Sequence, residues 1–578
     1  MPFVYAFEAK SIQRYITETG RLRDLAGGSL LVDALAAPAD ARGHSADLVE
    51  AVLAQMEHPH LTFVRRAGGA FALVSDDKGE LETFRALYTL AVQGFAPQLA
   101  FADGIASGET LGAALKAVVA SQTASRACIR PSLPEIGPLT ALAPRTGRAA
   151  VAIVHDERID LASSARRSAI AFQKSARDRG ELAGIEHRMM PPARRVTCVW
   201  PNELDAADAM PGAIVMPGLG ENSTVGLLHA DGNGLGQLLI SIRSKLEPVT
   251  DTASVANFLM TLSREIAAAT ERAIHVAVEE VLVHEAIGDP DAIGEDHRLV
   301  LAARPIVMGG DDVTMLLRGD LAMPFCRRFL LAFETETAVA MTNTTKTVPK
   351  GLQIELPQKL TACAGIAYVN ASQPFDRASD LAEQLCASAK QISKSDAGRF
   401  KMAEVMSSVS FHRVTTSRFA EYASIRDGEL RVVSDRGSEH DLYMTMGAYR
   451  LSDVGPADQF MKPLDSLIKL ASLLGEDRFP DGPLRQYLGV LSDQPLDAGD
   501  TYKRWRKVMQ SRGHKSEGGM LTQFDVALAE LGVVTPETAP IVANDPQRPS
   551  SGQRTPLLDA YSLKMAARRL NKNLDAAS

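Results

Sequence analysis

The hydrophobic positions along the chain form short apolar runs separated by longer stretches with helical spacing. Residues 225–230, 298–307 and 313–317 have the aliphatic and β-branched content of buried strands. Residues 255–286 are dense in Ala, Val, Leu and Glu, and we expect them to form a long helix that ends at Gly288. The order strand, helix, hairpin, helix, strand, helix predicts an α+β fold of the ferredoxin-like type, with an antiparallel sheet backed by helices.

The same order occurs in the first 130 residues, so the chain contains an internal repeat. Residues 3–8 correspond to 225–231, and residues 99–106 correspond to 360–367 and end in the same Gly-Ile-Ala. We therefore predict two copies of one fold. Beyond residue 410 the pattern is mainly helical, with helices expected at 460–474, 484–491, 521–531 and 561–574.

Two glycines and two carboxylates, Gly309-Gly310-Asp311-Asp312, stand between the two strands of the predicted hairpin. Gly-Gly between strands is a strong hairpin signal. A straight strand directs Asp311 and Asp312 to opposite faces, but bending beside the glycines can bring both carboxylates to one cation. Taken alone, the motif also fits an acidic surface turn.

The first copy lacks this acidic pair. The repeat aligns Gly68-Gly69 with Gly309-Gly310, and Ala70-Phe71 with the two aspartates. A structural duplication would also produce a repeat, but the loss of acidic residues from one copy indicates that the retained set serves chemistry. The first copy is therefore predicted to be catalytically degenerate.

A third carboxylate, Asp231, ends the apolar run 225–230 and precedes a glycine-rich stretch, residues 232–236. The glycines followed by leucines at helical spacing predict a strand, a tight turn and a helix start. Such a turn can present backbone N–H groups to phosphates. If the strands that carry Asp231 and Asp311 are neighbours in one sheet, their carboxylates meet in a site of the kind that magnesium prefers.

These motifs carry a family resemblance. The order DGNGLG, long helical insert, GGDD, LTACAGIAYV and AEQLCASAK resembles the palm domain of GGDEF-type and CRISPR-type nucleotide cyclases. More narrowly, residues 12–16 and 23–29 make the chain similar to the large palm-domain subunit of type III CRISPR effectors. The resemblance covers residues 1–410 and is loose beyond them.

The resemblance implies a set of functional residues. Asp231, Asp311 and Asp312, with the carbonyl of Gly232, would hold two Mg²⁺ or Mn²⁺ ions. The nucleotide would be bound by a wider group: Gly232, Asn233, Gly234, Leu235, Gly236, Gly309, Gly310 and Lys390. Relatives often carry a zinc-binding segment in the connector between palms, but this chain keeps only Cys128 there, so no zinc is expected. A metal-dependent nuclease domain before the first palm is also expected to be absent, because that palm begins at Phe3.

We accordingly predict four regions: a degenerate palm at 1–130, a partly helical connector with a zinc-segment remnant at 131–215, a catalytic palm at 216–410 and a mainly helical domain at 411–578. A chain of 578 residues is longer than one hydrophobic core usually organises, so several domains are expected. A net charge of −8 argues against a protein that coats nucleic acid or a membrane through its overall electrostatic field.

Five dispersed cysteines without a C-x-x-C pair argue against a disulfide scaffold. No uncharged apolar run reaches 18 residues, so a cytoplasmic protein without a membrane partner is expected. No P-loop pattern occurs.

Residues 502–515 interleave basic and aromatic side chains. Such a segment can bind RNA or an acidic partner, but the pattern fits a solvated basic helix equally well. His275 and Glu279 share a helical face and are interpreted as a satisfied pair.

The leading hypothesis for function is a nucleotidyltransferase that joins nucleoside triphosphates, with ATP favoured, into a cyclic di- or oligonucleotide for antiviral signalling. RNA or CRISPR-type effector subunits are expected as partners of the C-terminal domain. One alternative is a diguanylate-cyclase-like enzyme that uses GTP. The other is a non-catalytic scaffold that binds nucleotide or RNA.

Overall fold

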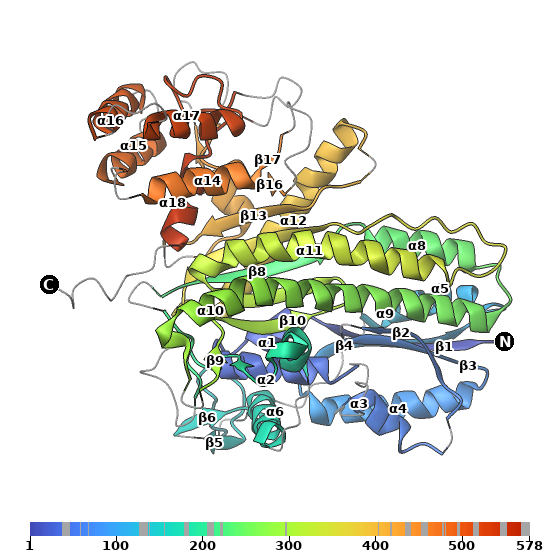
Figure 1. The fold of residues 1–578 in the computed structure, drawn as a ribbon. Helices are drawn as coiled ribbons and strands as arrows, with labels where there is room; N and C mark the ends of the chain where they lie inside the picture. The colour runs from blue at the N-terminus through green and yellow to red at the C-terminus, as the bar shows by residue number, and fades with distance from the viewer. Residues whose placement is uncertain are drawn as a thin grey trace.

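The computed structural model describes most of the chain, and the description below is restricted to that part. The residues left out are 37–46, 58, 68, 127–136, 138, 155, 179–183, 205–212, 220–222, 295–296, 403, 417–418, 434–440, 452–459, 477–478, 480, 494–497, 513–518, 544–551 and 568–578. Two sheets with their helices form the body of the molecule, and the C-terminal helices form a lobe beside it (Figure 1).

The first unit contains a four-stranded sheet with strand order β2-β3-β1-β4. All its neighbouring strands are antiparallel. Its elements are β1 (Phe3–Lys10), α1 (Ile12–Thr17), α2 (Leu22–Asp33), α3 (Leu48–Leu53), β2 (Thr62–Ala67), β3 (Ala70–Ser75), α4 (Lys78–Phe95), β4 (Ala100–Ser107) and α5 (Leu111–Arg126).

The second unit repeats this strand order as β10-β11-β8-β12 within a seven-stranded sheet. Its elements are β8 (Thr224–Gly232), α8 (Leu235–Leu246), α9 (Thr252–Ala277), a π-helical segment (Val278–Val283), α10 (His284–Gly288), β9 (Leu299–Val300), β10 (Ala303–Met308), β11 (Asp312–Arg318), α11 (Gly319–Thr345), β12 (Ala362–Asn370) and α12 (Phe375–Arg399). The long helix predicted at 255–286 is confirmed, with Asp251 capping its first turn through the Ser254 N–H.

Helices cover both faces of the second sheet because small residues let them approach. A Cβ added to Gly226 of β8 would touch Ala322 of α11, and one added to Gly365 of β12 would touch the backbone of α12. Gly365 is paired with His229, three residues from Gly226, so the two glycines face opposite sides of the sheet. The helix α11 therefore lies on one face, packed along α9 (Figure 1), and α12 lies on the other.

The two units pack against each other in a reciprocal way. The first unit's α1 contacts α12, and the second unit's α8 contacts α5. Gly112 of α5 lies so close to Leu246 and Glu247 that a side chain there would collide with the backbone. The hydrophobic core runs continuously through both units.

The connector contains β5 (Ala152–Val154), β6 (Glu157–Ile159), α6 (Leu161–Asp178), α7 (Ile185–Met189) and β7 (Cys198–Val199). The Glu157 carboxylate of the connector pairs with Arg21 and Arg23 of the first unit, and with Arg145 and Arg167 of the connector itself. Burial alone would raise the pKa of Glu157, but Arg167, Arg145 and Arg21 lower it to about 2. Cys128 and much of the predicted irregular stretch lie outside the described residues.

The sheet of the second unit extends past the predicted domain boundary at 410. That boundary falls inside β13 (Ser408–Arg413), which pairs in parallel with β12 and continues through β16 (Tyr449–Arg450) to β17 (Lys462–Pro463). A short apolar run of this kind carries no mark of the sheet it joins. A small sheet of β14 (Arg431–Val432), β15 (Leu442–Tyr443) and β18 (Gln553–Arg554) follows.

The C-terminal lobe consists of α14 (Leu464–Gly475), α15 (Asp481–Asp493), α16 (Ala498–Arg512), α17 (Met520–Glu530) and α18 (Leu557–Ala566). Its core includes Tyr502 and Trp505 of the basic segment, and Arg506 is buried against Asp525. These aromatic rings are unavailable for stacking on bases, whereas Lys503, Arg504 and Lys507 are exposed. None of the helices in the described part has the length and apolarity needed to cross a bilayer.

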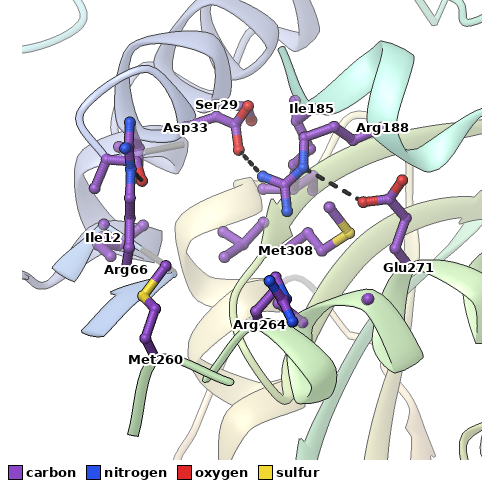
Figure 2. A pocket seen from close by; sticks show the side chains of 17 residues that line it. Ile12, Ser29, Asp33, Arg66, Ile185, Arg188, Met260, Arg264, Glu271 and Met308 are labelled. Carbon is purple, nitrogen blue, oxygen red and sulfur yellow. Dashed lines mark hydrogen bonds and ion pairs between the residues drawn. The ribbon is translucent and has the colours of Figure 1, made fainter. Parts of the chain in front are cut away.

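A cavity of about 170 Å³ lies where the first unit, the connector and the second unit meet. Arg188 of α7 crosses it, donating to Asp33 of α2 at 2.6 Å and lying 3.6 Å from Glu271 of α9 (Figure 2). Burial raises the pKa of Asp33, and its Oδ2 has no hydrogen-bond partner among the described residues. One wall is formed by Met308, the residue before the Gly309-Gly310 turn (Figure 2).

Candidate active site

The two acidic motifs come together at one end of the second sheet. β8 and β11 are antiparallel neighbours, and Asp231 is the register partner of Asp312. Register partners direct their side chains to the same face, so the two carboxylates lie side by side. The adjacency expected for Asp231 and the GGDD hairpin is therefore present, although 80 residues separate them in sequence.

The hairpin holds Asp311 and Asp312 in different ways. The Asp312 carbonyl accepts a hydrogen bond from Gly309 N–H at 2.8 Å, and the Asp311 carbonyl accepts one from Gly232 N–H at 3.2 Å. A Cβ at Gly232 would lie 2.6 Å from Asp311 Oδ2, and one at Gly309 would lie 1.6 Å from Asp312 Oδ1. The two glycines are thus required for space beside the carboxylates, and neither has a left-handed φ.

Crowding and burial raise the affinity of these carboxylates for protons. Burial, followed by the nearby charges of Asp231 and Asp312, raises the pKa of Asp311 to about 7. Burial and the charge of Asp231 raise the pKa of Asp312 to about 6. The three groups therefore interact as a cluster whose negative charge the neighbouring protein only partly compensates.

Lys390 supplies part of that compensation. From α12 its ammonium contacts the Asp231 carboxylate and donates to the Gly232 carbonyl at 2.8 Å. The Asp231 side chain remains 40% exposed. The predicted lysine is thus at the site, where it touches two of the four groups predicted to bind metal.

The glycine-rich turn provides fewer free amides than the sequence predicted. Asn233 N–H donates to the Thr361 carbonyl at 2.7 Å, and its side chain donates to Thr361 Oγ1 at 3.0 Å. The N–H groups of Gly232 and Asn233 are therefore engaged within the protein. Gly234, at φ +76°, opens α8 ahead of Leu235 and Gly236, so this turn leads into the helix N-terminus, whose first amides lack intrahelical acceptors.

The acidic edge opens into a cleft of about 390 Å³ shared by both units. One side includes Asp231, Gly309, Gly310, Asp311 and Asp312, and the other includes residues of β1, β2, β3 and α5. Arg65 of β2 and Arg243 of α8 also line the cleft. The charge of Arg65 counteracts the rise in the pKa of Asp311. The candidate site is therefore composite, with one wall from each unit.

The first unit's wall differs from the sequence alignment by one residue. Ala70 is paired with Glu8 as Asp312 is paired with Asp231, and the β-bulges of the two hairpins, at 63–65 and 305–307, lie at equivalent positions. Ala70 thus corresponds to Asp312, rather than to Asp311 as the alignment placed it. The pairing of each hairpin with its central strand, β1 or β8, sets this correspondence, and the sequence does not reveal that pairing. Gly68 lies outside the described residues.

The oxygen atoms grouped at the candidate site are of the kind that a hard divalent cation binds. They are carboxylate oxygens and a backbone carbonyl oxygen, which magnesium prefers, and the raised pKa values of Asp311 and Asp312 reflect negative charge that a cation would neutralise. In the described part of the chain, no three His, Cys, Asp or Glu side chains are already grouped as a metal cage. The ammonium of Lys390 lies against Asp231 in this arrangement.

Four residues at the site carried too weak a sequence signal to be assigned a role. His229 lines the cleft on the same face of β8 as Asp231, and burial lowers its pKa to about 4. Gln13 of α1 reaches His229 from the first unit. Thr270 of α9 donates to the Gly310 carbonyl at 2.7 Å, and Arg65 reaches the cleft from β2. A Gln, Thr or Arg within a helix or strand looks the same whether or not it meets a distant site.

The structure also shows the surroundings of His275, Glu279 and four of the cysteines. His275 Nε2 lies 2.6 Å from the Arg188 carbonyl and Glu279 pairs with Arg194, so this pair is structural. Four of the five cysteines, Cys198, Cys326, Cys363 and Cys386, are buried free thiols.

An antiparallel sheet whose central strands end in carboxylates beside a cleft defines a palm-type domain. Residues 224–399 match the model of the Cas10/Cmr2 family that is described as its second palm domain. This part of the chain is therefore similar to the second palm domain of the Cas10/Cmr2 family, and the resemblance to the large palm-domain subunit of type III CRISPR effectors is confirmed.

Among solved structures, Csm1 of T. onnurineus is similar at 14% identity over 98% of this chain and 70% of that chain, with a TM-score of 0.48. The Csm1–Csm4 cassette in complex with cA4 and the cassette in complex with AMPPNP are each 14% identical over 98% of this chain and 70% of theirs, with TM-scores of 0.46. No curated protein sequence matches the chain significantly.

Proposed function

We propose that the chain is a nucleotidyltransferase that joins ATP into a cyclic oligonucleotide in the cleft between its two units. The observation that carries the proposal is the register pairing of Asp231 with Asp312, beside Asp311, at the mouth of a cleft that both units line. The Cas10/Cmr2 palm match favours ATP among the triphosphates and a role in antiviral defence.

Asp231, Asp311, Asp312 and the Gly232 carbonyl would hold two Mg²⁺ or Mn²⁺ ions. When bound, such ions neutralise charge on the attacking and leaving oxygens of phosphoryl transfer. The protein's own contribution is positioning: the glycines at 232 and 309 let carboxylates approach the backbone, and Thr270 holds the hairpin against α9.

Lys390 supplies a positive charge that binds the triphosphate once cations satisfy Asp231. The first-turn amides of α8, from Gly234 to Gly236, face the same region and are donors for phosphate oxygens. We infer that the first unit is a degenerate palm that forms the wall for a second nucleotide, because Ala70 stands at its Asp312 position.

The C-terminal lobe is proposed to contact RNA or CRISPR-type effector subunits. Its exposed Lys503, Arg504 and Lys507 lie on one helix, α16, and are the residues available for phosphate contacts. The buried aromatic residues of the same helix serve its core instead.

The test is to incubate the purified protein with each labelled nucleoside triphosphate and Mg²⁺, with and without RNA, and to resolve the products. We expect a cyclic product from ATP that is lost in the double variant Asp311→Ala, Asp312→Ala. Asp76→Ala is the matched control, because the Asp76 side chain is 91% exposed and outside the cleft. A product from GTP alone would favour a diguanylate-cyclase-like enzyme, and binding without turnover would favour a scaffold.

A further inference from the structure

A hydrogen-bonded network connects the first unit to the catalytic strands. Gln13 of α1 donates from Nε2 to His229 Nδ1 at 3.0 Å and lies 3.3 Å from Thr314 Oγ1, while its Oε1 accepts from Ser379 Oγ at 2.9 Å. The four residues belong to α1, β8, β11 and α12. A single glutamine from the first unit thus touches three elements of the second.

The network determines which nitrogen of His229 carries the proton. The Gln13 amide has its Oε1 at Ser379 Oγ and its Nε2 at His229 Nδ1; an amide N–H only donates, so Nδ1 is the acceptor. Thr314 Oγ1, 3.1 Å from the same Nδ1, is its second neighbour. The neutral ring therefore carries its hydrogen on Nε2.

The Nε2–H group is directed away from this network. It has no partner among the described residues and is not enclosed by them, and His229 lines the cleft beside Asp231. His229 is two positions from Asp231 on one face of β8, which is roughly 6.6 Å along a strand. A donor at that separation from the carboxylates reaches the sugar and base of a nucleotide whose phosphates lie at Asp231.

We propose that His229 is a nucleotide-binding residue that donates from Nε2 to an acceptor on the ribose or base, and that Gln13 is the positioning residue that sets this tautomer. The inference rests on the proposed nucleotide chemistry of the cleft and adds a contribution of the first unit to substrate binding. That unit's helix α1 thereby acts on the catalytic strands directly.

Two measurements test the proposal. In ¹⁵N-histidine NMR spectra, the His229 signal, identified by its loss in His229→Ala, is expected to show the Nε2–H tautomer in the native protein. In Gln13→Glu the carboxylate can only accept, so the tautomer is expected to change to Nδ1–H. A native Nδ1–H form, or no change in Gln13→Glu, would overturn the role of Gln13.

The second measurement is the affinity for a non-hydrolysable ATP analogue, with kcat at saturating ATP. His229→Ala and Gln13→Glu are each expected to weaken binding roughly 5- to 10-fold, the range for one hydrogen bond. Because such a contact acts in the ground state and transition state alike, kcat should change less than threefold. His284→Ala and Gln93→Glu, both at exposed helical positions, are the matched controls.

The outcomes separate this inference from the proposed function. Native binding and turnover with unchanged affinity in His229→Ala would overturn the inference and leave the proposed function intact. A native protein that binds no nucleotide would overturn both. A fall in kcat and melting temperature without a change in affinity would show that His229 is structural only.

Discussion

Two glycines beside the carboxylates of the candidate site lack room for any side chain. The closest case is Gly309, where an added Cβ would overlap Asp312 Oδ1. Because the obstruction is the carboxylate itself, relief requires Asp312 to leave its position opposite Asp231. Gly309 is thus required for the space that it leaves beside Asp312 rather than for its backbone conformation.

We expect Gly309→Ala to reduce turnover at least about 100-fold by displacing Asp312, since misplacing a catalytic group by about an ångström has this effect. The control is Gly398→Ala on α12, where a Cβ meets nothing within 4 Å and helix propensity predicts a gain of about 0.5–1 kcal/mol. Turnover assays and thermal unfolding measure both. Full activity in Gly309→Ala would show that Asp312 is dispensable.

The carboxylate cluster also makes stability depend on pH. In the folded state the pKa of Asp311 is about 7 and that of Asp312 about 6, both above the usual 3.8. The folded protein therefore binds more protons than the unfolded chain between about pH 4 and 7, so stability contributed by these groups is present below that range and declines as pH rises through it.

Without divalent cations, the melting temperature is expected to fall between pH 5 and 7.5 by more in the native protein than in Asp312→Asn. Added Mg²⁺ should raise it more at pH 7.5 than at pH 5, because cations replace the protons. Scanning calorimetry at each pH checks this. Equal slopes in the two proteins would exclude Asp312 as the source.

At the scale of elements, the long helix α9 supports the hairpin that carries Asp311 and Asp312. Its Thr270 is fully buried and donates to Gly310 O at 2.7 Å, and Ser263 and Ile266 of the same helix line the cleft. The Thr270 hydroxyl thus links the helix α9 to the turn that carries the two aspartates.

Thr270→Val preserves the shape of the side chain and removes this hydrogen bond. We expect a loss of about 1 kcal/mol in unfolding free energy and a larger proportional loss in kcat than in nucleotide affinity, because the hairpin is no longer held in place. Thr335→Val on the exposed face of α11 is the control, since its hydroxyl bonds only within its own helix. Equal effects from the two variants would contradict a role for Thr270 at the hairpin.

For the whole molecule, Arg188 ties the two units together through the connector. It pairs with Asp33 of the first unit and Glu271 of the second beside the cavity behind the hairpin (Figure 2). The Asp33 side chain is only 6% exposed, so its charge depends on this partner.

Arg188→Met is expected to destabilise the protein by about 3 kcal/mol, because it leaves a buried carboxylate unpaired. The double variant Asp33→Asn, Arg188→Met should recover a substantial part of that loss, since the unpaired charge is gone. Chemical denaturation of the four proteins of this cycle measures the coupling. Purely additive losses would show that the pair does not join the units energetically.

The sequence by itself determined the order of elements, the repeat, and the residues at the ends of β8 and β11. Those features depend on local periodicity and on glycine, which a single stretch of chain reveals. Asp231 and the GGDD motif are therefore recognisable in the sequence alone, whereas Lys390 is indicated only by the family resemblance. The continuation of the sheet through β13 was missed because strand neighbours lie far apart in sequence.

Only the tertiary structure decided which groups meet across long separations. The contact of Gln13 with His229, the strand pairing that aligns Ala70 with Asp312, and the burial of Trp505 all depend on packing between distant segments. The same packing directed the Asn233 amide to Thr361. Local pattern specifies an element and its acidic ends, whereas long-range packing and strand register specify what those ends face.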